Sequence, residues 1–417
     1  MIQGGSGVPW RISSPEHAET RSTPRPGGHG TRRAWDPTGM GPDGTTRGLG
    51  DEEEFDDGRE VAVSVRVGIN GFGRIGRNFV RAVLSQERVG SAGGESSPAE
   101  IEVVAVNDLT SARTNAQLLR CDSTHGRLGA TVEVDGDDLV VAGKRIRVLA
   151  EREPAELPWG ELGVDVVLEA TGRFTSRGDA AAHLKGGATR VIISAPSPDA
   201  DATFVVGVND DAFDPEHDVV VSNASCTTNC FVPMVKVIED AFGVTAGLMT
   251  TVHAYTNDQN LLDLPHSDLR RARAAAVNIV PSSTGAARAT HLVLKEMKGR
   301  LDGSSLRVPV PDGSITDFTV VVPGELGVDD VNEAFRDAAS KPPLERVLVY
   351  SEDPIVSSDI VGSPASCTFD SGLTMVQAVG NGSSLVKVFG WYDNEWGYSN
   401  RLVDLVGIVA DATTGGR

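Results

Sequence analysis

The sequence predicts an α/β protein in which a doubly wound parallel sheet is followed by an α+β domain with a mainly antiparallel sheet. Three observations support this fold class. Short, nearly continuous apolar segments alternate with helix-length segments between residues 61 and 225. A Gly-x-Gly-x-x-Gly motif stands at the first strand-to-helix junction, and longer strands with fewer helices follow residue 226. Strands buried on both faces of a parallel sheet have this apolar character, because helices cover both of its sides.

The first domain is predicted over residues 61–225. Its expected strands are the apolar or β-branched segments at 61–70, 101–108, 165–172, 190–196 and 218–225. A helical pattern follows the first strand from Arg74 to about Val89. We expect the amphipathic segment at 394–417 to form a C-terminal helix that completes this domain.

The second domain is predicted over residues 226–393. Its expected strands lie within 247–256, 305–322, 346–351 and 384–394, and its expected helices lie near 229–241, 284–299 and 328–340. Residues 1–60 are rich in Gly, Pro, Arg and Asp and have almost no aliphatic side chains. We expect a disordered extension without a catalytic role, since it cannot offset the entropy lost on ordering. A targeting segment and an over-extended gene start are alternatives.

The composition narrows the possible functions. The chain has 417 residues, 40% of them hydrophobic, and no apolar run approaches the length of a membrane span. A net charge of −20 argues against nucleic acid as a partner, because phosphate backbones bind basic surfaces. Four cysteines are too few for a disulfide framework, which indicates a reducing, cytoplasmic setting. Cys226 and Cys230 lack the second ligand pair of a structural zinc site, so we expect no metal.

The motif Gly71-Phe72-Gly73-Arg74-Ile75-Gly76 predicts a dinucleotide site of the Rossmann type. Its first glycine allows a tight turn, its second lets the backbone approach a pyrophosphate, and its third permits close packing of helix and strand. Asp108 ends the next strand, 32 residues beyond Gly76, and the insert GSAGGESSPAE is expected to be a surface loop that accounts for the long spacing. A carboxylate there accepts hydrogen bonds from a ribose diol and repels a 2′-phosphate, which favours NAD over NADP.

Residues 222–230 read SNASCTTNC and place Cys226 where a helix is expected to begin. Ser, Thr and Asn are the residues that cap helix N-termini, and the positive end of a helix favours a thiolate. The stretch therefore predicts a nucleophilic cysteine. Taken alone, a cysteine in such a stretch is more often a small buried hydrophobic residue, which here could share a helix face with Cys230.

Eight motifs in order resemble glyceraldehyde-3-phosphate dehydrogenases of the phosphorylating, bacterial type, from about Val65 to about Leu405. They are GINGFGRIGR, CDSTHGRL, EATGRFT, RVIISAPS, SNASCTTNC, TTVHAYTNDQ, PSSTGAARA and WYDNEWGYSNR. The resemblance implies a homotetramer, NAD as cofactor, and oxidation of glyceraldehyde 3-phosphate to an acyl phosphate with inorganic phosphate. It implies that Cys226 is the nucleophile and His253 its base.

The resemblance also assigns binding roles. The cofactor site would comprise Asn70, Gly71, Phe72, Gly73, Arg74, Ile75, Gly76, Asp108, Arg152, Thr171, Gly172, Ser194, Asn394 and Tyr398. The two phosphate sites would comprise Ser225, Thr227, Thr284 and Gly285 for inorganic phosphate, and Thr256 and Arg307 for the substrate's own phosphate, with Arg271 between them. Leu109 and the pair Leu264-Pro265 stand where NADP-using members differ, which again favours NAD. Asp258 stands where animal members have Thr, and PVPDGSITD replaces a Pro-Thr-x-Asn-Val sequence.

The chemistry explains why this reaction needs a cysteine and a histidine. An aldehyde carbon must be attacked before it can give up a hydride, and a thiolate is both a good nucleophile and a good later leaving group. An imidazole can take the proton of the resulting hydroxyl. Two alternatives stay open at this stage. Erythrose-4-phosphate dehydrogenase shares fold and cysteine but uses water as acceptor, and a non-catalytic redox-sensing or binding protein would use Cys226 differently.

Overall fold

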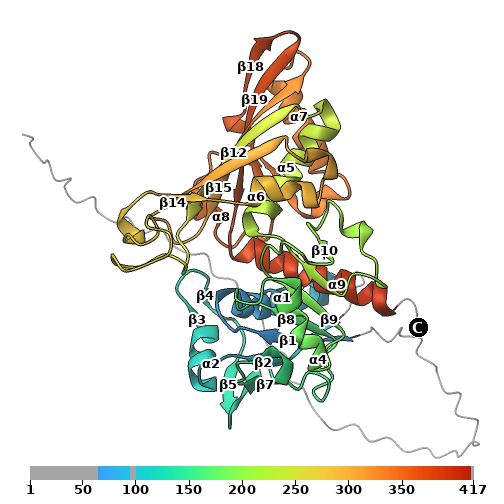
Figure 1. The fold of residues 1–417 in the computed structure, drawn as a ribbon, viewed down its shortest axis with the longest axis vertical. Helices are drawn as coiled ribbons and strands as arrows, with labels where there is room; N and C mark the ends of the chain where they lie inside the picture. Colours follow the sequence, from blue (N-terminus) through green and yellow to red (C-terminus); the bar gives the residue numbers. More distant parts are fainter. Residues whose placement is uncertain (1–63, 94–99, 415–417) are drawn as a thin grey trace, which may run out of the picture. The chain divides into compact units, whose positions relative to one another are not determined.

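The computed structural model describes residues 64–93 and 100–414, so the extension expected at 1–60 lies outside the described residues. The predicted α/β fold class is confirmed. Most strands of the described residues belong to two large sheets, one mainly parallel and one mainly antiparallel (Figure 1). None of the described helices is long and apolar enough to cross a membrane.

The first sheet is parallel over most of its width. In spatial order it consists of β10 (Ala202–Thr203), β11 (Val220–Ser222), β9 (Arg190–Ile193), β8 (Val166–Glu169), β1 (Ser64–Asn70), β2 (Glu100–Asn107), β7 (Lys144–Leu149), β6 (Asp138–Val141) and β5 (Val132–Asp135). The exceptions are the two antiparallel pairs β7–β6 and β6–β5. The chain leaves β1 toward β2 and later returns to the other side of β1 as β8. Ligands of such sheets bind at the carboxyl ends of the strands where this reversal occurs.

Helices pack against this sheet at several points. They are α1 (Arg74–Gly93), α2 (Ala112–Arg120), the short α3 (Arg177–Ala180) and α4 (Ala182–Lys185), and the C-terminal α9 (Trp396–Thr414). Helix α1 is longer than the sequence predicted, and α9 lies alongside it (Figure 1). Phe79 and Val83 of α1 and Leu402 and Val406 of α9 belong to one buried core. A small hairpin, β3 (Cys121–Asp122) and β4 (Gly126–Arg127), follows α2.

The second sheet contains β13 (Val280–Ser283), β14 (Leu301–Val308), β12 (Ala246–Ala254), β15 (Ser314–Pro323), β19 (Ser383–Tyr392), β17 (Cys367–Asp370) and β16 (Leu348–Ser351), with β18 (Met375–Gly380) paired to β19. It is antiparallel except for the pairs β12–β14 and β16–β17. Helix α5 (Cys226–Phe242) packs on β15, β17 and β19 and also contacts α7 (Val328–Ala338). Its buried face carries Phe231, which meets Phe318 of β15 edge to face.

One expected helix is wrong. The segment 284–299 forms only the single turn α6 (Ala286–Ala289), followed by two short 3₁₀ turns at 290–292 and 295–297. The Thr290 hydroxyl donates to the Ala286 carbonyl at 3.3 Å. Threonine side chains that bond back to the helix backbone in this way compete with helix continuation.

Candidate active site

Three glycines shape the start of α1 as the motif predicts. Gly71 has φ +95°, and a Cβ there would lie 2.7 Å from the backbone of Thr171. A Cβ on Gly76 would lie 2.3 Å from the Gly71 carbonyl oxygen. At Gly73, by contrast, a Cβ would meet nothing within 4 Å, so the backbone faces open space. The residues therefore fit a dinucleotide, whose pyrophosphate needs bare backbone and the free N–H groups of a helix start.

A cavity of about 540 Å³ lies at the carboxyl ends of β1, β2 and β8. Six predicted cofactor residues line it: Asn70, Gly71, Gly73, Asp108, Arg152 and Thr171. The others do not line it. The Phe72 side chain is buried in the core and Ile75 packs against that core. Gly172 follows Thr171 with φ +68°, and Ser194 directly follows β9. Because β1 pairs with β8, Gly71 and Thr171 line one groove although they are 100 positions apart in the sequence.

Asp108 lies at this groove as expected. Its Oδ2 accepts a hydrogen bond from the Phe72 backbone N–H at 3.0 Å, and its Oδ1 accepts one from Thr110 at 3.0 Å. These two bonds fix the carboxylate and leave each oxygen a further lone pair. A fixed negative charge here accepts hydrogen bonds from a ribose diol and repels a 2′-phosphate.

No sequence pattern predicted the buried network behind the groove. The Glu169 carboxylate is 2% exposed and accepts hydrogen bonds from Asn70 Nδ2 at 2.7 Å and from the Thr171 N–H at 2.9 Å. His183 Nε2 lies 3.0 Å from it. Trp159 donates to the other ring nitrogen, Nδ1, at 3.0 Å, so Nε2 carries the proton and donates to Glu169. This network orients two groove residues, Asn70 and Thr171, from positions far apart in the sequence.

Cys226 is the first residue of α5. Ser225 caps the helix, since its Oγ accepts the Thr228 N–H at 3.0 Å. Asn229 ties the turn together by donating to the carbonyls of Asn223 and Ser225, at 2.9 and 3.0 Å. Ala224 has φ +54°, an unfavourable conformation for a residue with a Cβ. Tyr398 of α9 donates to the Ala224 carbonyl at 3.1 Å and so helps to hold this turn.

The two expected catalytic side chains meet. Cys226 Sγ lies 3.5 Å from His253 Nε2, and His253 is 4% exposed on β12. Tyr392 of β19 stands edge-on to the imidazole, with ring centroids 5.8 Å apart. The Tyr392 hydroxyl lies 2.9 Å from Thr227 Oγ1 and 2.7 Å from Thr251 Oγ1. Thr227, expected to bind phosphate, is therefore buried and engaged with Tyr392 instead.

The helix end is expected to favour the Cys226 thiolate, and burial acts against it. Burial raises the pKa of the Cys226 thiol to about 11, although the Arg307 charge opposes this shift. Burial lowers the pKa of His253 to about 3, and Arg307 lowers it further. Each group alone is therefore neutral at pH 7. Ionisation requires the thiol proton to pass to Nε2, because only the resulting ion pair offsets the loss of solvation.

Arg307 sits beside the histidine, opposite it in the β12–β14 register. Its Nη1 lies 2.6 Å from His253 Nδ1 and donates to the Ala254 carbonyl at 3.1 Å. The same Nδ1 lies 2.7 Å from that carbonyl, which favours a proton on Nδ1 and a lone pair on Nε2. A guanidinium N–H at Nδ1 favours the opposite tautomer, so an anion that drew Arg307 away would leave Nε2 as the base. Arg307 Nε is buried and has no hydrogen-bond partner in the part of the chain that the structure describes, which suits a group that binds an anion.

The other expected phosphate ligands form two further groups. Thr256 and Arg271 both bind the carboxylate of Asp258, so their hydrogen bonds are made to an acidic side chain. Thr284 accepts the Ala286 N–H at 3.2 Å, and Gly285 beside it is exposed. Hydroxyls, a backbone N–H and guanidinium groups are the donors that phosphate oxygens prefer.

Comparison with known proteins identifies the family. Residues 65–177 match the profile "Glyceraldehyde 3-phosphate dehydrogenase, NAD binding domain", and residues 225–394 match "Glyceraldehyde 3-phosphate dehydrogenase, C-terminal domain". The glyceraldehyde-3-phosphate dehydrogenase of Streptomyces coelicolor is 59% identical over 349 residues, which cover 84% of this chain and 99% of that protein. The chain belongs to the glyceraldehyde-3-phosphate dehydrogenase family.

Two further relatives agree with this result. "Glyceraldehyde-3-phosphate dehydrogenase 2" of Streptomyces avermitilis is 58% identical over 349 residues, 84% of this chain and 99% of its own. The glyceraldehyde-3-phosphate dehydrogenase of Mycobacterium tuberculosis is 57% identical over 349 residues, 83% of this chain and 99% of its own. The resemblance inferred from the eight motifs is confirmed, and NAD is the cofactor of the matched domain.

In this member of the glyceraldehyde-3-phosphate dehydrogenase family, Asn394 is held in one orientation. It is 5% exposed, and its Oδ1 accepts the Ser314 hydroxyl at 2.7 Å. That bond leaves Nδ2 as the group to donate to a ligand. The arrangement suits the expected role, a hydrogen bond to the carboxamide oxygen of the nicotinamide.

Proposed function

We propose that this protein catalyses the NAD-dependent oxidation and phosphorylation of glyceraldehyde 3-phosphate to 1,3-bisphosphoglycerate, with Cys226 as nucleophile and His253 as its base. The dehydrogenase activity and the cofactor follow from the family. One observation carries the assignment of roles: Cys226 Sγ stands 3.5 Å from His253 Nε2 at the start of α5. This distance allows direct proton transfer as the sulfur attacks.

The reaction begins as the Cys226 proton passes to Nε2 and the sulfur bonds to the aldehyde carbon. The imidazolium then returns the proton to the oxyanion, and the backbone N–H groups at the start of α5 stabilise that oxygen. The product is a hemithioacetal on Cys226. Bound NAD supplies the hydride acceptor for the next step. As the C–H bond breaks, His253 takes the hydroxyl proton and the carbon becomes a thioester.

Phosphate completes the reaction. A phosphate oxygen attacks the thioester carbon, the C–S bond breaks, and the departing sulfur regains its proton from His253. We assign the substrate's own phosphate to Thr256 and Arg307, and inorganic phosphate to Ser225, Thr227, Thr284 and Gly285. Arg271 lies between them in this assignment. Among the described residues, Nε of Arg307 has no hydrogen-bond partner, which supports the first site. Thr227 can donate to phosphate when the Tyr392 hydroxyl is the donor in the bond between them.

The assembly and location of the protein are part of the same proposal. We assign residues 61–225 with the C-terminal helix to the NAD-binding domain, and 226–393 to the catalytic domain. The homotetramer is supported by a loop that exposes apolar side chains, of which Leu261, Leu262 and Leu269 are each at least 75% exposed. The cytoplasmic location is supported by four free cysteines.

A spectrophotometric assay tests the function. Cys226→Ser should abolish NADH formation while NAD binding remains, and Cys121→Ser serves as the control that keeps activity. Retained activity in Cys226→Ser would refute the mechanism. Wild-type NADH formation should depend on phosphate and prefer glyceraldehyde 3-phosphate to erythrose 4-phosphate. Equal rates without phosphate would favour the hydrolytic dehydrogenase instead.

A further inference from the structure

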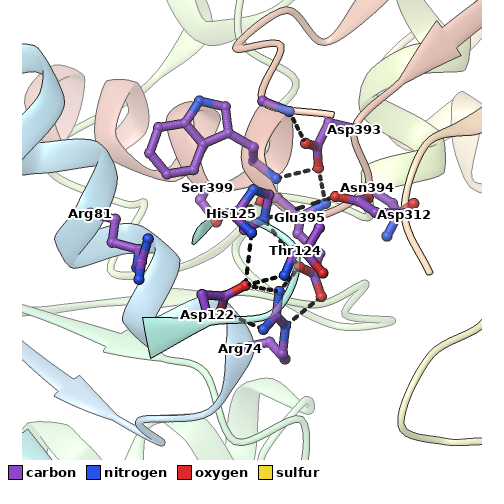
Figure 2. Close-up of polar contacts among 12 residues, drawn as sticks. Arg74, Arg81, Asp122, Thr124, His125, Asp312, Asp393, Asn394, Glu395 and Ser399 are labelled. Carbon is purple, nitrogen blue, oxygen red and sulfur yellow. Dashed lines mark hydrogen bonds and ion pairs between the residues drawn. The ribbon is translucent and has the colours of Figure 1, made fainter. Parts of the chain in front are cut away.

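A buried acidic cluster lies beside Asn394, outside the groups that the reaction uses. It consists of Asp122, Asp312, Asp393, Glu395, His125 and Arg74, which come from the β3–β4 hairpin, the β14–β15 turn, the start of α9 and the start of α1 (Figure 2). Four carboxylates face one guanidinium and one imidazole. Buried charges of like sign are costly unless each has partners, so the partners of each must be found.

Asp393 accepts three backbone hydrogen bonds as a carboxylate, which leaves one acceptor site. Its Oδ1 accepts the N–H groups of Glu395 and Trp396, at 2.8 and 2.6 Å, and its Oδ2 accepts that of Gly362 at 2.7 Å. It therefore caps the N-terminus of α9, where the helix dipole also favours a negative charge. Three N–H donors strongly stabilise the ionised form.

Glu395 and Asp122 are satisfied through Arg74. Arg74 Nε donates to Glu395 at 2.7 Å, and Nη1 donates to Asp122 at 2.5 Å. Although burial acts in the opposite direction, Arg74 keeps the pKa of Glu395 below its ordinary value. His125 Nε2 approaches Glu395 at 3.2 Å. Because Arg74 is shared between Glu395 and Asp122, its guanidinium does not also form an ion pair with Asp312.

Asp312 is the carboxylate of this cluster whose negative charge, if ionised, would have no cation and only one N–H hydrogen-bonded to it among the described residues. It is 1% exposed, and its Oδ1 accepts only the N–H of the next residue, Gly313, at 2.9 Å. Its Oδ2 has no hydrogen-bond partner among the described residues. Single oxygens of Asp312 and Asp393 and a ring nitrogen of His125 lie within 4.8 Å of one another. Two buried carboxylates in such proximity cannot both be ionised without a proton or cation between them.

A proton fits this place better than a metal ion. Both oxygens of Asp393 already accept backbone hydrogen bonds, and Glu395 is engaged with Arg74, so few lone pairs remain for a cation. His125 Nε2 lies 3.8 Å from Asp312 Oδ2, too far for a hydrogen bond, and is nearer to Glu395. A proton on Asp312, in contrast, needs one acceptor, and the Asp393 carboxylate provides it.

We propose that Asp312 is a neutral carboxylic acid in the folded enzyme at neutral pH and donates its proton to Asp393, and that this acid pair positions Asn394 for the cofactor. The two facing turns are joined twice, by Asp312 with Asp393 and by Ser314 with Asn394. Loss of the proton places two negative charges at the first junction and pushes the turns apart. The Asn394 amide then moves from its position. The inference rests on the proposed function in one respect, the contact of Asn394 with the nicotinamide.

The surrounding charges agree with a proton held on Asp312. Burial, with the nearby negative charges of Asp393 and Glu395, raises the pKa of Asp312 to about 8. His125 faces it from the β3–β4 hairpin. Helix α8 (Ser357–Ile360) packs against Gly313, but its Asp359 caps its own helix through the Val356 N–H. Because the pKa of Asp312 is higher in the folded state than in the unfolded state, its protonation stabilises the fold. This contribution to the free energy of unfolding is complete below the unfolded-state pKa and is lost as pH rises through about 8.

The test compares wild-type protein with Asp312→Asn, whose amide donates to Asp393 at every pH. Equilibrium NAD binding is measured by calorimetry from about pH 6.5 to about pH 9.5. Between these two pH values, the NAD dissociation constant of the wild type should rise roughly threefold or more beyond any rise seen for Asp312→Asn. The control Asp329→Asn, at an exposed site on α7, should follow the wild type. Parallel pH profiles of the wild type and Asp312→Asn would overturn the proposal.

A second measurement uses the wild type alone and does not depend on the folding of a variant. The infrared carbonyl band of a protonated carboxyl should be present at about pH 6.5 and lost by about pH 9.5. Absence of such a band, or elemental analysis showing one divalent cation per subunit, would overturn the proposal. NAD binding needs no chemistry at Cys226, so the same pH profile is expected in Cys226→Ser. A failure of the catalytic assignment is thus distinguishable from a failure of this inference.

Discussion

At the scale of single residues, burial governs the reactivity of Cys226. Because burial raises the thiol pKa to about 11, the isolated thiol would be only about one part in 10⁴ thiolate at pH 7. His253, 3.5 Å away, makes the thiolate accessible by taking the proton. In the proposed mechanism the pair, and not the helix end alone, creates the nucleophile.

This account predicts the effect of His253→Gln on alkylation of Cys226 by iodoacetamide. Without the imidazole, the alkylation rate at pH 7 should fall by roughly 10²-fold or more and should recover only as pH approaches about 11. NADH formation should fall by about 10²–10⁴-fold. His217→Gln, at an exposed histidine, is the control. Unchanged alkylation at pH 7 in His253→Gln would mean that the helix end alone activates the sulfur.

Asp258 gives a second prediction at this scale. Its carboxylate binds both Thr256 and Arg271, two groups assigned to phosphate, so it competes with a phosphate for them. Asp258→Asn should lower the KM for glyceraldehyde 3-phosphate severalfold, on the order of 1 kcal/mol, with little change in kcat. Asp263→Asn, in the same loop and paired with Arg273, is the matched control. A higher KM in Asp258→Asn would instead mean that Asp258 holds Arg271 in its working position.

At the scale of secondary structure, α5 and β19 approach closely at Gly390. A Cβ at Gly390 would lie 2.6 Å from both Cys367 Sγ and Met234 Sδ, and 3.2 Å from Cys230 Sγ. Met234 and Cys230 belong to α5, whose first residue is Cys226. The absence of a side chain on β19 thus sets how near the helix lies to the sheet that carries His253.

Gly390→Ala should therefore disturb both stability and activity. Overpacking of this kind costs about 1–3 kcal/mol of unfolding free energy, measured by thermal or denaturant melts. We also expect a lower kcat, because the shift of α5 changes the distance between Cys226 and His253. Gly178→Ala, where the nearest atom is 4.0 Å away, should be nearly neutral. Equal stability of the two variants would show that the helix adapts without cost.

The elements also show where sequence patterns succeed and fail. The strand ends at Gly71 and Asp108 and the start of α5 were predictable, because apolar runs and capping residues act locally. The segment 284–299 was not, since the competing hydrogen bond of Thr290 leaves no trace in hydrophobic periodicity. The partnership of Glu169 with Asn70 and His183 depends on the tertiary fold, and no spacing in the sequence reports it.

At the scale of the whole molecule, NAD binding is coupled to folding. A ligand that binds only the folded state stabilises it by mass action, by about 2.7 kcal/mol at 100 times its dissociation constant. We expect NAD to raise the melting temperature and NADP at equal concentration to raise it much less, because the Asp108 carboxylate lines the proposed cofactor groove and would repel a 2′-phosphate. Asp108→Asn should narrow that difference. Equal shifts with NAD and NADP in the wild type would contradict the role of Asp108.

The division of the chain into two sheets was predictable from the change in strand pattern near Cys226. The proximity of Cys226 and His253 and the shape of the glycine motif were likewise predictable, because the proposed chemistry requires particular residue types. The raised pKa of Cys226 was not evident, since it results from burial by parts of the chain distant in sequence, against the opposing charge of Arg307. Asp312 appeared only as a departure from the family pattern, and its meaning depends on Asp393, which lies 81 residues further on.

The contact from Tyr398 to the Ala224 carbonyl has a consequence for biosynthesis. On the ribosome, Cys226 and His253 emerge long before Asn394 and Tyr398. A nascent chain therefore lacks the Tyr398 hydrogen bond to the turn at Ala224, next to Cys226, until translation has nearly finished. The turn before Cys226 is therefore completed only when the last helix, α9, has been synthesised.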